Sequence, residues 1–235
     1  MVSEAYSFWD KFNSKYSKTW SSALRVILSE KEMAFINKYF PKSDKLKVLD
    51  IGFGAGRIIE NFIKKEDCKV FAIDQSINMY KFSLNKFSKT KNVNLAVCNI
   101  SKEDLPFKEK FDMVTAIRVL NYNENWVEIL EKIKKRCTKN AVIVFTMPNK
   151  NSLSRFGKAD YTYVRTTYFE VLAVCKKLGL EVLEINTFLR LPNKYYDLSN
   201  NYIYVKIILM LEDLLYFILG RTLFGKIFFI AARVK

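Results

Sequence analysis

The sequence predicts an α/β fold built on a mostly parallel sheet. From about residue 46 onward, short β-rich runs alternate with helix-like stretches of ten or more residues. The runs are nearly continuous in apolar residues, which is typical of parallel strands covered on both faces. Half of the 235 residues are hydrophobic, and seven glycines and four prolines leave no repeat or low-complexity linker. We therefore expect a single domain over residues 1–235.

The first 44 residues are predicted to form a helical lid. Two helix-like stretches cover residues 7–20 and 22–40. The first of them carries an apolar stripe with one residue in every four, formed by Phe8, Phe12, Tyr16 and Trp20. Such a stripe either packs on the core or folds over the mouth of a ligand site.

The sheet is assigned to residues 45–190 and 226–235. Its predicted strands are residues 46–51, 69–73, 93–97, 111–117, 141–146, 181–190 and 226–234. A helix that opens at Thr166 or Thr167 and closes at Gly179 separates the fifth strand from the sixth. Asn140 stands just before the fifth predicted strand and is a residue type that tolerates the left-handed conformation.

Residues 191–225 are more than a minimal sheet needs, and we expect them to form a helical insertion that caps the substrate. Their most apolar part, residues 202–220, holds three charges, of which Lys206 and Asp213 are seven apart and share one side of a helix. The stretch is too polar to span a membrane. It can pack on the domain, roof an apolar pocket, or lie on a lipid surface with Arg221 and Lys226 near the headgroups.

Composition excludes several kinds of site. The chain has no histidine, and its four cysteines are 30, 39 and 38 residues apart without a C-x-x-C pair. We therefore expect no metal site and no thiol–histidine nucleophile, and we interpret the cysteines as reduced, buried thiols. The chain also lacks a long uncharged apolar stretch and a signal peptide, which predicts a cytoplasmic protein with no transmembrane segment.

The net charge of +15 would suit nucleic acid or anionic lipid. However, the 30 lysines and nine arginines occur in twos and threes along every segment. Lysine is a flexible point charge, whereas base and phosphate readout favours the rigid fork of arginine. This distribution favours a general surface bias over a nucleic-acid face, and it is compatible with peripheral membrane contact. The sequence carries no signal for an oligomeric state.

The stretch VLDIGFGAGR, residues 48–57, places Gly52, Gly54 and Gly56 between a strand and a helix. Glycine permits positive φ and close approach of a ligand, so a nucleotide-like ligand is implied. The spacing is G-x-G-x-G, with Arg57 where a dinucleotide fingerprint needs its third glycine, and no G-K-[ST] follows. Asp50 is a poor neighbour for a pyrophosphate but a good partner for a ligand ammonium group.

The second strand ends at Asp74, 18 residues beyond Gly56. A carboxylate at this place can accept hydrogen bonds from two ribose hydroxyls. Alternatively, it caps the helix-like stretch that follows.

Together these segments resemble the class I S-adenosylmethionine-dependent methyltransferases, over residues 45–190 and the last strand. The matching segments are VLDIGFGAGR, VFAIDQS, NLAVCNISKEDLPF, FDMVTAIRVLNY and CTKNAVIVFTMPN. The resemblance implies a Rossmann-like sheet of seven strands, the last one antiparallel, with helices on both faces. It also implies S-adenosylmethionine as cofactor and S-adenosylhomocysteine as product.

The resemblance assigns roles around the cofactor. Asp50 and the turn from Gly52 through Phe53 and Gly54 to Gly56 would hold the methionine part, Asp74 the ribose, and Gln75 and Met79 the adenine. Asn99 and Ile100 would contact the adenine edge, and Ile117 would lie beside the cofactor. Asn99 stands where the family usually has an acid, although an amide oxygen can also accept from the adenine amino group.

The end of the fourth strand faces the transferred methyl group in this fold, which makes Arg118, Asn121 and Tyr122 the candidates for catalysis. Arg118 could clamp a carboxylate or phosphate, and Tyr122 could orient or deprotonate the nucleophile. The alternatives are a surface ion pair and a half-buried tyrosine at a helix start. The sequence RVLN after this strand differs from the N-P-P-Y-like tetrapeptide of base-specific amino-methyltransferases, and no Pro-Cys pair is present for pyrimidine C5 chemistry.

The expected function is methyl transfer to a small, partly apolar or lipid-linked acceptor. Alternatives are an RNA methyltransferase, suggested by the positive charge, and a relative that binds the cofactor or a partner protein without catalysis.

Overall fold

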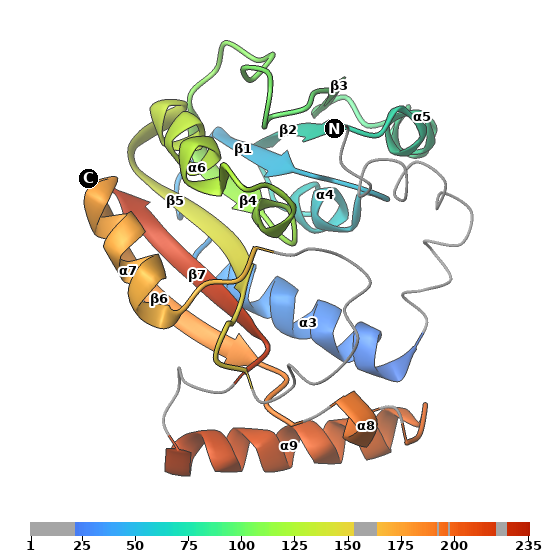
Figure 1. The fold of residues 1–235 in the computed structure, drawn as a ribbon. Helices are drawn as coiled ribbons and strands as arrows, with labels where there is room; N and C mark the ends of the chain where they lie inside the picture. Colours follow the sequence, from blue (N-terminus) through green and yellow to red (C-terminus); the bar gives the residue numbers. More distant parts are fainter. Residues whose placement is uncertain (1–21, 153–163, 192, 197, 220–224) are drawn as a thin grey trace.

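The computed structural model describes residues 22–152, 164–191, 193–196, 198–219 and 225–235. Its centre is a seven-stranded sheet in the order β3-β2-β1-β4-β5-β7-β6 (Figure 1). The strands are β1 (Leu46–Ile51), β2 (Cys68–Asp74), β3 (Val93–Val97), β4 (Phe111–Ala116), β5 (Cys137–Pro148), β6 (Leu180–Phe188) and β7 (Ile227–Val234). Only β7 is antiparallel to its neighbours, β5 and β6. The predicted mostly parallel sheet is confirmed.

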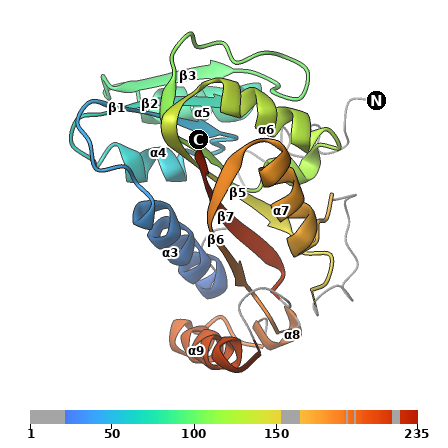
Figure 2. The same ribbon diagram turned by 90° about the vertical axis from the view of Figure 1, so that its left-hand side faces the viewer.

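Helices cover both faces of the sheet (Figures 1 and 2). They are α3 (Ala23–Lys38), α4 (Arg57–Phe62), α5 (Ile77–Lys86), α6 (Trp126–Lys135), α7 (Tyr168–Lys177), α8 (Asn193–Tyr196) and α9 (Tyr202–Leu219), with a 3₁₀ turn, η1 (Leu120–Tyr122). Buried side chains of α3, α4 and α5 share one hydrophobic cluster, and those of α6 and α7 share the cluster on the opposite face. The predicted three-layer arrangement is therefore present.

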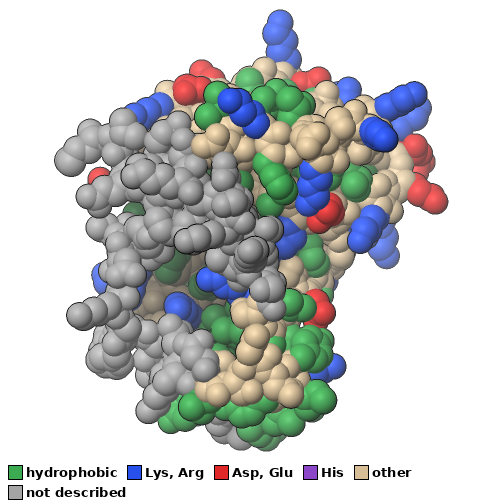
Figure 3. All heavy atoms as spheres, turned by 90° about the vertical axis from the view of Figure 1, so that its right-hand side faces the viewer, with side chains coloured by type: hydrophobic (Ala, Val, Ile, Leu, Met, Phe, Trp, Pro, Cys, Tyr) green, Lys and Arg blue, Asp and Glu red, His purple; other side chains and the backbone are tan. Residues whose placement is uncertain are grey.

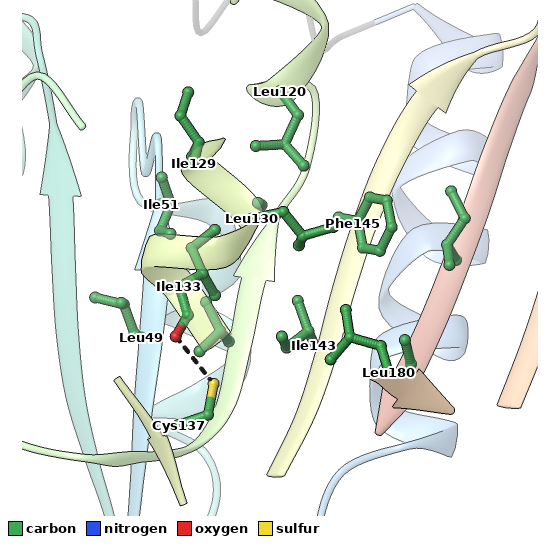
Figure 4. Packing of buried hydrophobic residues seen from close by; sticks show 14 of the residues in the cluster. Leu49, Ile51, Leu120, Ile129, Leu130, Ile133, Cys137, Ile143, Phe145 and Leu180 are labelled. Carbon is green, nitrogen blue, oxygen red and sulfur yellow. Dashed lines mark hydrogen bonds between the residues drawn. The ribbon is translucent and has the colours of Figure 1, made fainter. Parts of the chain in front are cut away.

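The face under α6 shows how the core is filled. Ile129, Leu130 and Ile133 of α6 pack toward buried side chains of β1 and β5 (Figure 4). The Cys137 thiol donates to the Ile133 carbonyl oxygen at 3.3 Å. All four cysteines are free and buried, and burial raises the pKa of each thiol to about 11 or 12. They are packing residues, as the sequence indicated.

Local signals explain the ends of several elements. Thr167 caps α7 in a capping box with Glu170, and Gly179 closes that helix region at φ 64°. Asn140 has φ 66°, in the left-handed region that the sequence led us to expect. It lies inside β5, however, because this strand begins four residues earlier than predicted. A bulge at this point lets Cys137 pair with Phe111.

The second predicted N-terminal helix is α3, whereas the first, with Phe8, Phe12, Tyr16 and Trp20, lies outside the described residues. The helix predicted within residues 202–220 is α9. One side of it packs on the start of α3 and on α8, where Ile27, Leu28, Val205 and Leu209 are buried together. Within the described part of the chain, none of the helices is both long and apolar enough to cross a membrane.

Candidate ligand site

The candidate site lies at the carboxyl ends of the parallel strands. The direction in which strands are added to the sheet reverses between β1 and β4. After β1 the chain continues to β2 and β3 on one side of β1, and it then returns to place β4 on the other side. The loops after these two strands therefore diverge, and such a switch point is the usual ligand position in open α/β sheets. The glycine turn after β1 stands at this point.

The three glycines of the turn are required by its backbone and packing. Gly52, Gly54 and Gly56 have φ values of 73°, 51° and 79°, in the left-handed region that other residues adopt only with strain. A Cβ at Gly52 would lie 2.3 Å from Cγ2 of Val119, and one at Gly56 would lie 2.4 Å from the Phe87 ring. The turn therefore fits closely between the loop after β4 and helix α5.

The N–H groups of the turn are mostly bonded within the protein. Those of Gly52 and Phe53 donate to the Ile73 carbonyl oxygen at 2.7 and 3.3 Å, and that of Gly56 donates to the Phe53 carbonyl at 2.8 Å. The Gly54 N–H donates to Oδ2 of Asp74 at 2.8 Å. A phosphate-binding loop needs several converging, available N–H groups. This turn does not have that arrangement.

Asp50 brings a buried carboxyl group to the turn. Its Oδ1 accepts a hydrogen bond from the Thr115 hydroxyl at 2.7 Å, and its Oδ2 has no hydrogen-bond partner among the residues that the structure describes. Burial raises the pKa of Asp50 to about 7, although the Thr115 hydrogen bond and the charge of Arg57 act in the opposite direction. An unsatisfied buried oxygen of this kind fits a cationic donor from a ligand.

Asp74 is the last residue of β2, and its carboxylate links the glycine turn to the segment before α5. Its Oδ2 accepts from Gly54, and its Oδ1 accepts from the Ser76 N–H at 2.9 Å. Ser76, not Asp74, caps α5, because the Ser76 hydroxyl accepts from the Met79 N–H at 3.2 Å. The alternative that Asp74 is a helix cap is therefore wrong. The Gln75 N–H is a further backbone donor to this carboxylate, and the three donors oppose the burial that raises the pKa of Asp74.

The other predicted cofactor residues lie around these two carboxylates. The Cys98 N–H donates to the Asp74 backbone carbonyl oxygen at 3.0 Å, which places Asn99 and Ile100 beside the end of β2. Oδ1 of Asn99 accepts from the Ser101 hydroxyl at 2.7 Å, so this oxygen is already engaged. Gln75 is partly exposed. Three of the predicted residues belong to one buried cluster, namely Phe53, Met79 and Ile117.

The predicted catalytic residues follow β4. Arg118 has φ 60°, and its N–H donates to the Thr146 hydroxyl at 2.7 Å. Its guanidinium pairs with Glu32 of α3, so the ion pair anticipated as an alternative exists, but its acidic partner is buried. Asn121 is buried, and its backbone carbonyl oxygen accepts from the Val164 N–H at 2.9 Å. Tyr122 is partly exposed.

Glu32 is the site residue that sequence reasoning missed. It is 1 % exposed and pairs with both Arg57, directly after the glycine turn, and Arg118. Arg57 also donates to the Ser29 hydroxyl at 2.8 Å. Helix α3 thus joins the loops after β1 and β4. The available signal was the position of Glu32 on the apolar face of Leu28, Phe35 and Ile36, where an acid requires a cationic partner.

Comparisons with known proteins identify the family of this chain. Residues 42–200, well over half of the chain, match the family described as a methyltransferase domain. A search of curated proteins found no match.

Solved structures with the same fold cover most of the chain. A chain from the Haloferax volcanii complex that contains the Trm112 methyltransferase activator has a TM-score of 0.67 and 15 % identity, with 100 % of this chain and 99 % of that chain covered. An S-adenosylmethionine-dependent methyltransferase from Aquifex aeolicus has a TM-score of 0.59 and 17 % identity, covering 87 % and 90 %. Phosphoethanolamine N-methyltransferase 2 from Haemonchus contortus has a TM-score of 0.62 and 17 % identity, covering 95 % and 60 %. At these identities the likeness establishes the fold.

Proposed function

The chain belongs to the methyltransferase domain family, of the class I S-adenosylmethionine-dependent type, and on that premise we propose that it methylates a small, apolar or lipid-linked acceptor. The observation that carries the cofactor part of this proposal is the glycine turn. Four of its N–H groups are bonded within the protein, and two carboxyl groups, Asp50 and Asp74, flank it. Such a site disfavours phosphates and suits a cationic nucleoside.

The residues present fit S-adenosylmethionine. Oδ2 of Asp50 would accept from the ligand's ammonium group, and the Asp74 carboxylate would accept from its ribose hydroxyls. The apolar side chains of Phe53, Met79 and Ile117 would line the binding surface, with Gln75, Asn99 and Ile100 around the adenine. When bound, S-adenosylmethionine supplies a methyl group activated by the positive sulfur.

The chain's contribution to the reaction is chiefly alignment. Holding the nucleophile in line with the methyl group and excluding water can contribute up to about 7 to 11 kcal/mol in well-oriented systems. For an oxygen or carbon acceptor, the site would also have to take up the proton that the acceptor loses on methylation. Tyr122 and Asn121 at the end of β4 would orient the acceptor. Arg118 would position this loop through Glu32.

The acceptor class is supported by the segment after β6. Helices α8 and α9 stand at the end of the sheet where loops carry the site, and they present large apolar side chains. The Haemonchus contortus enzyme is named for a small acceptor, phosphoethanolamine, so this fold accommodates such molecules.

Two other functions are favoured by single observations. The net charge of +15 favours an RNA acceptor. The Trm112-containing relative favours a chain that acts with a protein partner. Both predict the same cofactor site.

The test combines binding and turnover. Isothermal titration calorimetry should detect S-adenosylmethionine and S-adenosylhomocysteine but neither NAD nor ATP. Asp74→Ala removes the predicted ribose acceptor and the partner of the Gly54 N–H. The affinity for S-adenosylmethionine should therefore fall by about 100-fold, which corresponds to the loss of roughly two hydrogen bonds to a charged group. Asp44→Ala, at an exposed position away from the site, is the control.

Labelled methyl transfer into separated lipid, RNA and small-molecule fractions then identifies the acceptor. Label in the lipid or small-molecule fraction supports the proposal. Label only in RNA supports the RNA alternative. Binding without transfer in any fraction indicates a binding protein, and no binding of either cofactor form would overturn the proposal altogether.

A further inference from the structure

Helix α9 presents a continuous apolar face to solvent. The exposed residues on it are Ile203, Ile207, Met210, Leu211, Leu214 and Phe217. Their spacing of three or four residues, with one adjacent pair, places them along one side of the helix. Phe217 is 88 % exposed and Ile203 is 67 % exposed. Hydrophobic side chains gather along the lower edge of the molecule in Figure 3, where α9 lies in Figure 1.

The opposite side of α9 is fastened to the protein, so the apolar face cannot roll inward. Val205 and Leu209 are buried against α3. The Glu212 carboxylate, 1 % exposed, accepts from the backbone N–H groups of Arg190 and Leu191 at 2.6 and 2.8 Å. A buried carboxylate with two backbone donors fixes the rotation of the helix about its axis. Exposure of the apolar face is therefore part of the folded state.

The charges around this face favour an anionic partner. Both acidic residues of α9 are engaged, because Asp213 pairs with Lys31 at 3.0 Å and with Arg190 at 3.6 Å, while Glu212 is buried. Lys206, the basic residue in the described part of α9, is exposed at the edge of the apolar face. The whole chain carries +15, which creates a long-range attraction to negative surfaces.

We propose that α9 docks on an anionic lipid bilayer, with its apolar face in the headgroup boundary and Lys206 among the lipid phosphates. An 18-residue helix is about 27 Å long and can lie flat in that boundary. Tyr195 and Tyr202, both about 40 % exposed, stand near its start and suit the interface between lipid and water.

A second copy of the chain fits this face less well. Stable protein interfaces involve about 20 to 30 residues on each side, whereas the face has six large side chains on one helix. Two chains of charge +15 also repel each other. A lipid surface has neither restriction.

Docking would bring the candidate site toward the membrane. Strands β5 and β6 are both antiparallel to β7 and so run in the same direction. The segment after β6 therefore leaves the sheet at the edge that carries the loops after β1, β2 and β4. A lipid-linked acceptor could reach the site from the bilayer surface. This consequence rests on the proposed function, whereas the docking itself does not.

The test is cosedimentation of the whole chain with vesicles. One set contains phosphatidylcholine alone and the other equal parts of phosphatidylcholine and phosphatidylglycerol, at low salt and at about 0.5 M salt, where the Debye length falls to a few ångströms. We expect at least about tenfold stronger binding to the anionic vesicles, weakened by salt. The double variant Ile207→Glu with Met210→Glu should lower that binding by a further factor of about ten or more, because it places charges on the apolar face that would enter the headgroup boundary.

The matched control is Phe82→Glu with Leu84→Glu on α5. These side chains are 45 % and 49 % exposed, and the change in net charge is the same. This variant should keep most of the binding, and melting curves should be similar for both variants. Failure of the unaltered chain to bind anionic vesicles, or equal loss in both variants, would overturn the proposal. So would a dimer by light scattering that only the α9 variant dissociates. None of these results depends on methyl transfer.

Discussion

The glycine turn and α9 stand at the same edge of the sheet but are built in opposite ways. In the turn, four backbone N–H groups, Oδ1 of Asp50 and both carboxylate oxygens of Asp74 have defined partners, and two glycines leave no room for a Cβ. The outer face of α9 has large side chains exposed to solvent. The turn can select a ligand by geometry, because its groups are fixed in advance. The helix face can only offer apolar area, which suits a fluid partner.

The largest expected effect tests how tightly the site region is fixed. Glu32→Gln keeps the side-chain shape but removes the buried charge between Arg57 and Arg118. Breaking a buried pair by neutralising one partner typically costs about 3 kcal/mol or more, so urea denaturation should show a loss of this size. Glu30→Gln, an exposed acid on the same helix, should cost less than about 0.5 kcal/mol. Equal effects would mean that Glu32 does not join the two loops.

A second prediction separates crowding from backbone strain in the turn. Gly56→Ala forces a side chain into the left-handed region and toward the Phe87 ring, and should cost about 2 to 3 kcal/mol of unfolding free energy. Gly179→Ala has a similar φ, but its Cβ would meet only Lys134 Nζ, at 3.4 Å. It should cost about 1 kcal/mol. If the two costs were the same, the close fit against α5 would have no energetic weight.

The third prediction concerns pH. Because the pKa of Asp50 is raised to about 7 in the folded protein, the folded state holds its proton more tightly than the unfolded state. The ligand-free protein should therefore lose stability as pH rises toward 7. A ligand ammonium group favours the ionised form, so affinity for S-adenosylmethionine should rise about tenfold between pH 6 and 8. Calorimetry with Asp50→Asn should show weaker binding without this rise; an unchanged pH profile would remove Asp50 from the cofactor site.

The smallest effect is expected on the outer face of α9. Leu214→Gln, at a side chain 60 % exposed, should change the unfolding free energy by less than about 0.5 kcal/mol. Leu209→Gln on the buried side of the same helix should cost about 3 kcal/mol, measured in the same urea titration. A large loss from Leu214→Gln would show that this face is covered by protein, and the contrast with the glycine turn would fail.

Much of the fold was predictable because its signals are local. The strands lie within a few residues of their predicted ranges, since a buried parallel strand is a short apolar run with clear breaks. The glycine turn and the acid ending β2 were recognised because their spacing along the chain is fixed by one strand–turn–helix unit. The distribution of apolar residues also predicted that α9 has a very wide apolar surface, but it left open whether that surface packs on the domain, roofs a pocket or lies on lipid.

The cross-links of the site were not predictable in the same way. Glu32 pairs with residues 25 and 86 positions away, and nothing in its neighbourhood identifies which cation it meets. Arg118 was assigned to a ligand or a surface pair, whereas the structure places it against a buried acid of α3. Likewise, in the sequence Glu212 is one of three charged residues in an apolar helical stretch, and only the folded structure places its carboxylate against the backbone of Arg190. Long-range pairings of single charged residues leave no periodic trace.

The position of β7 has a consequence for how the chain assembles. β7 lies between β5 and β6, and in the described sheet β6 joins the other strands only through it. Yet β7 is synthesised after both. During translation, β6 and α7 must wait for a partner about 40 residues further along the chain, and such non-local pairing slows the final step. Nascent chains that stop before residue 227 should therefore expose the open edge of β5 and depend on chaperones.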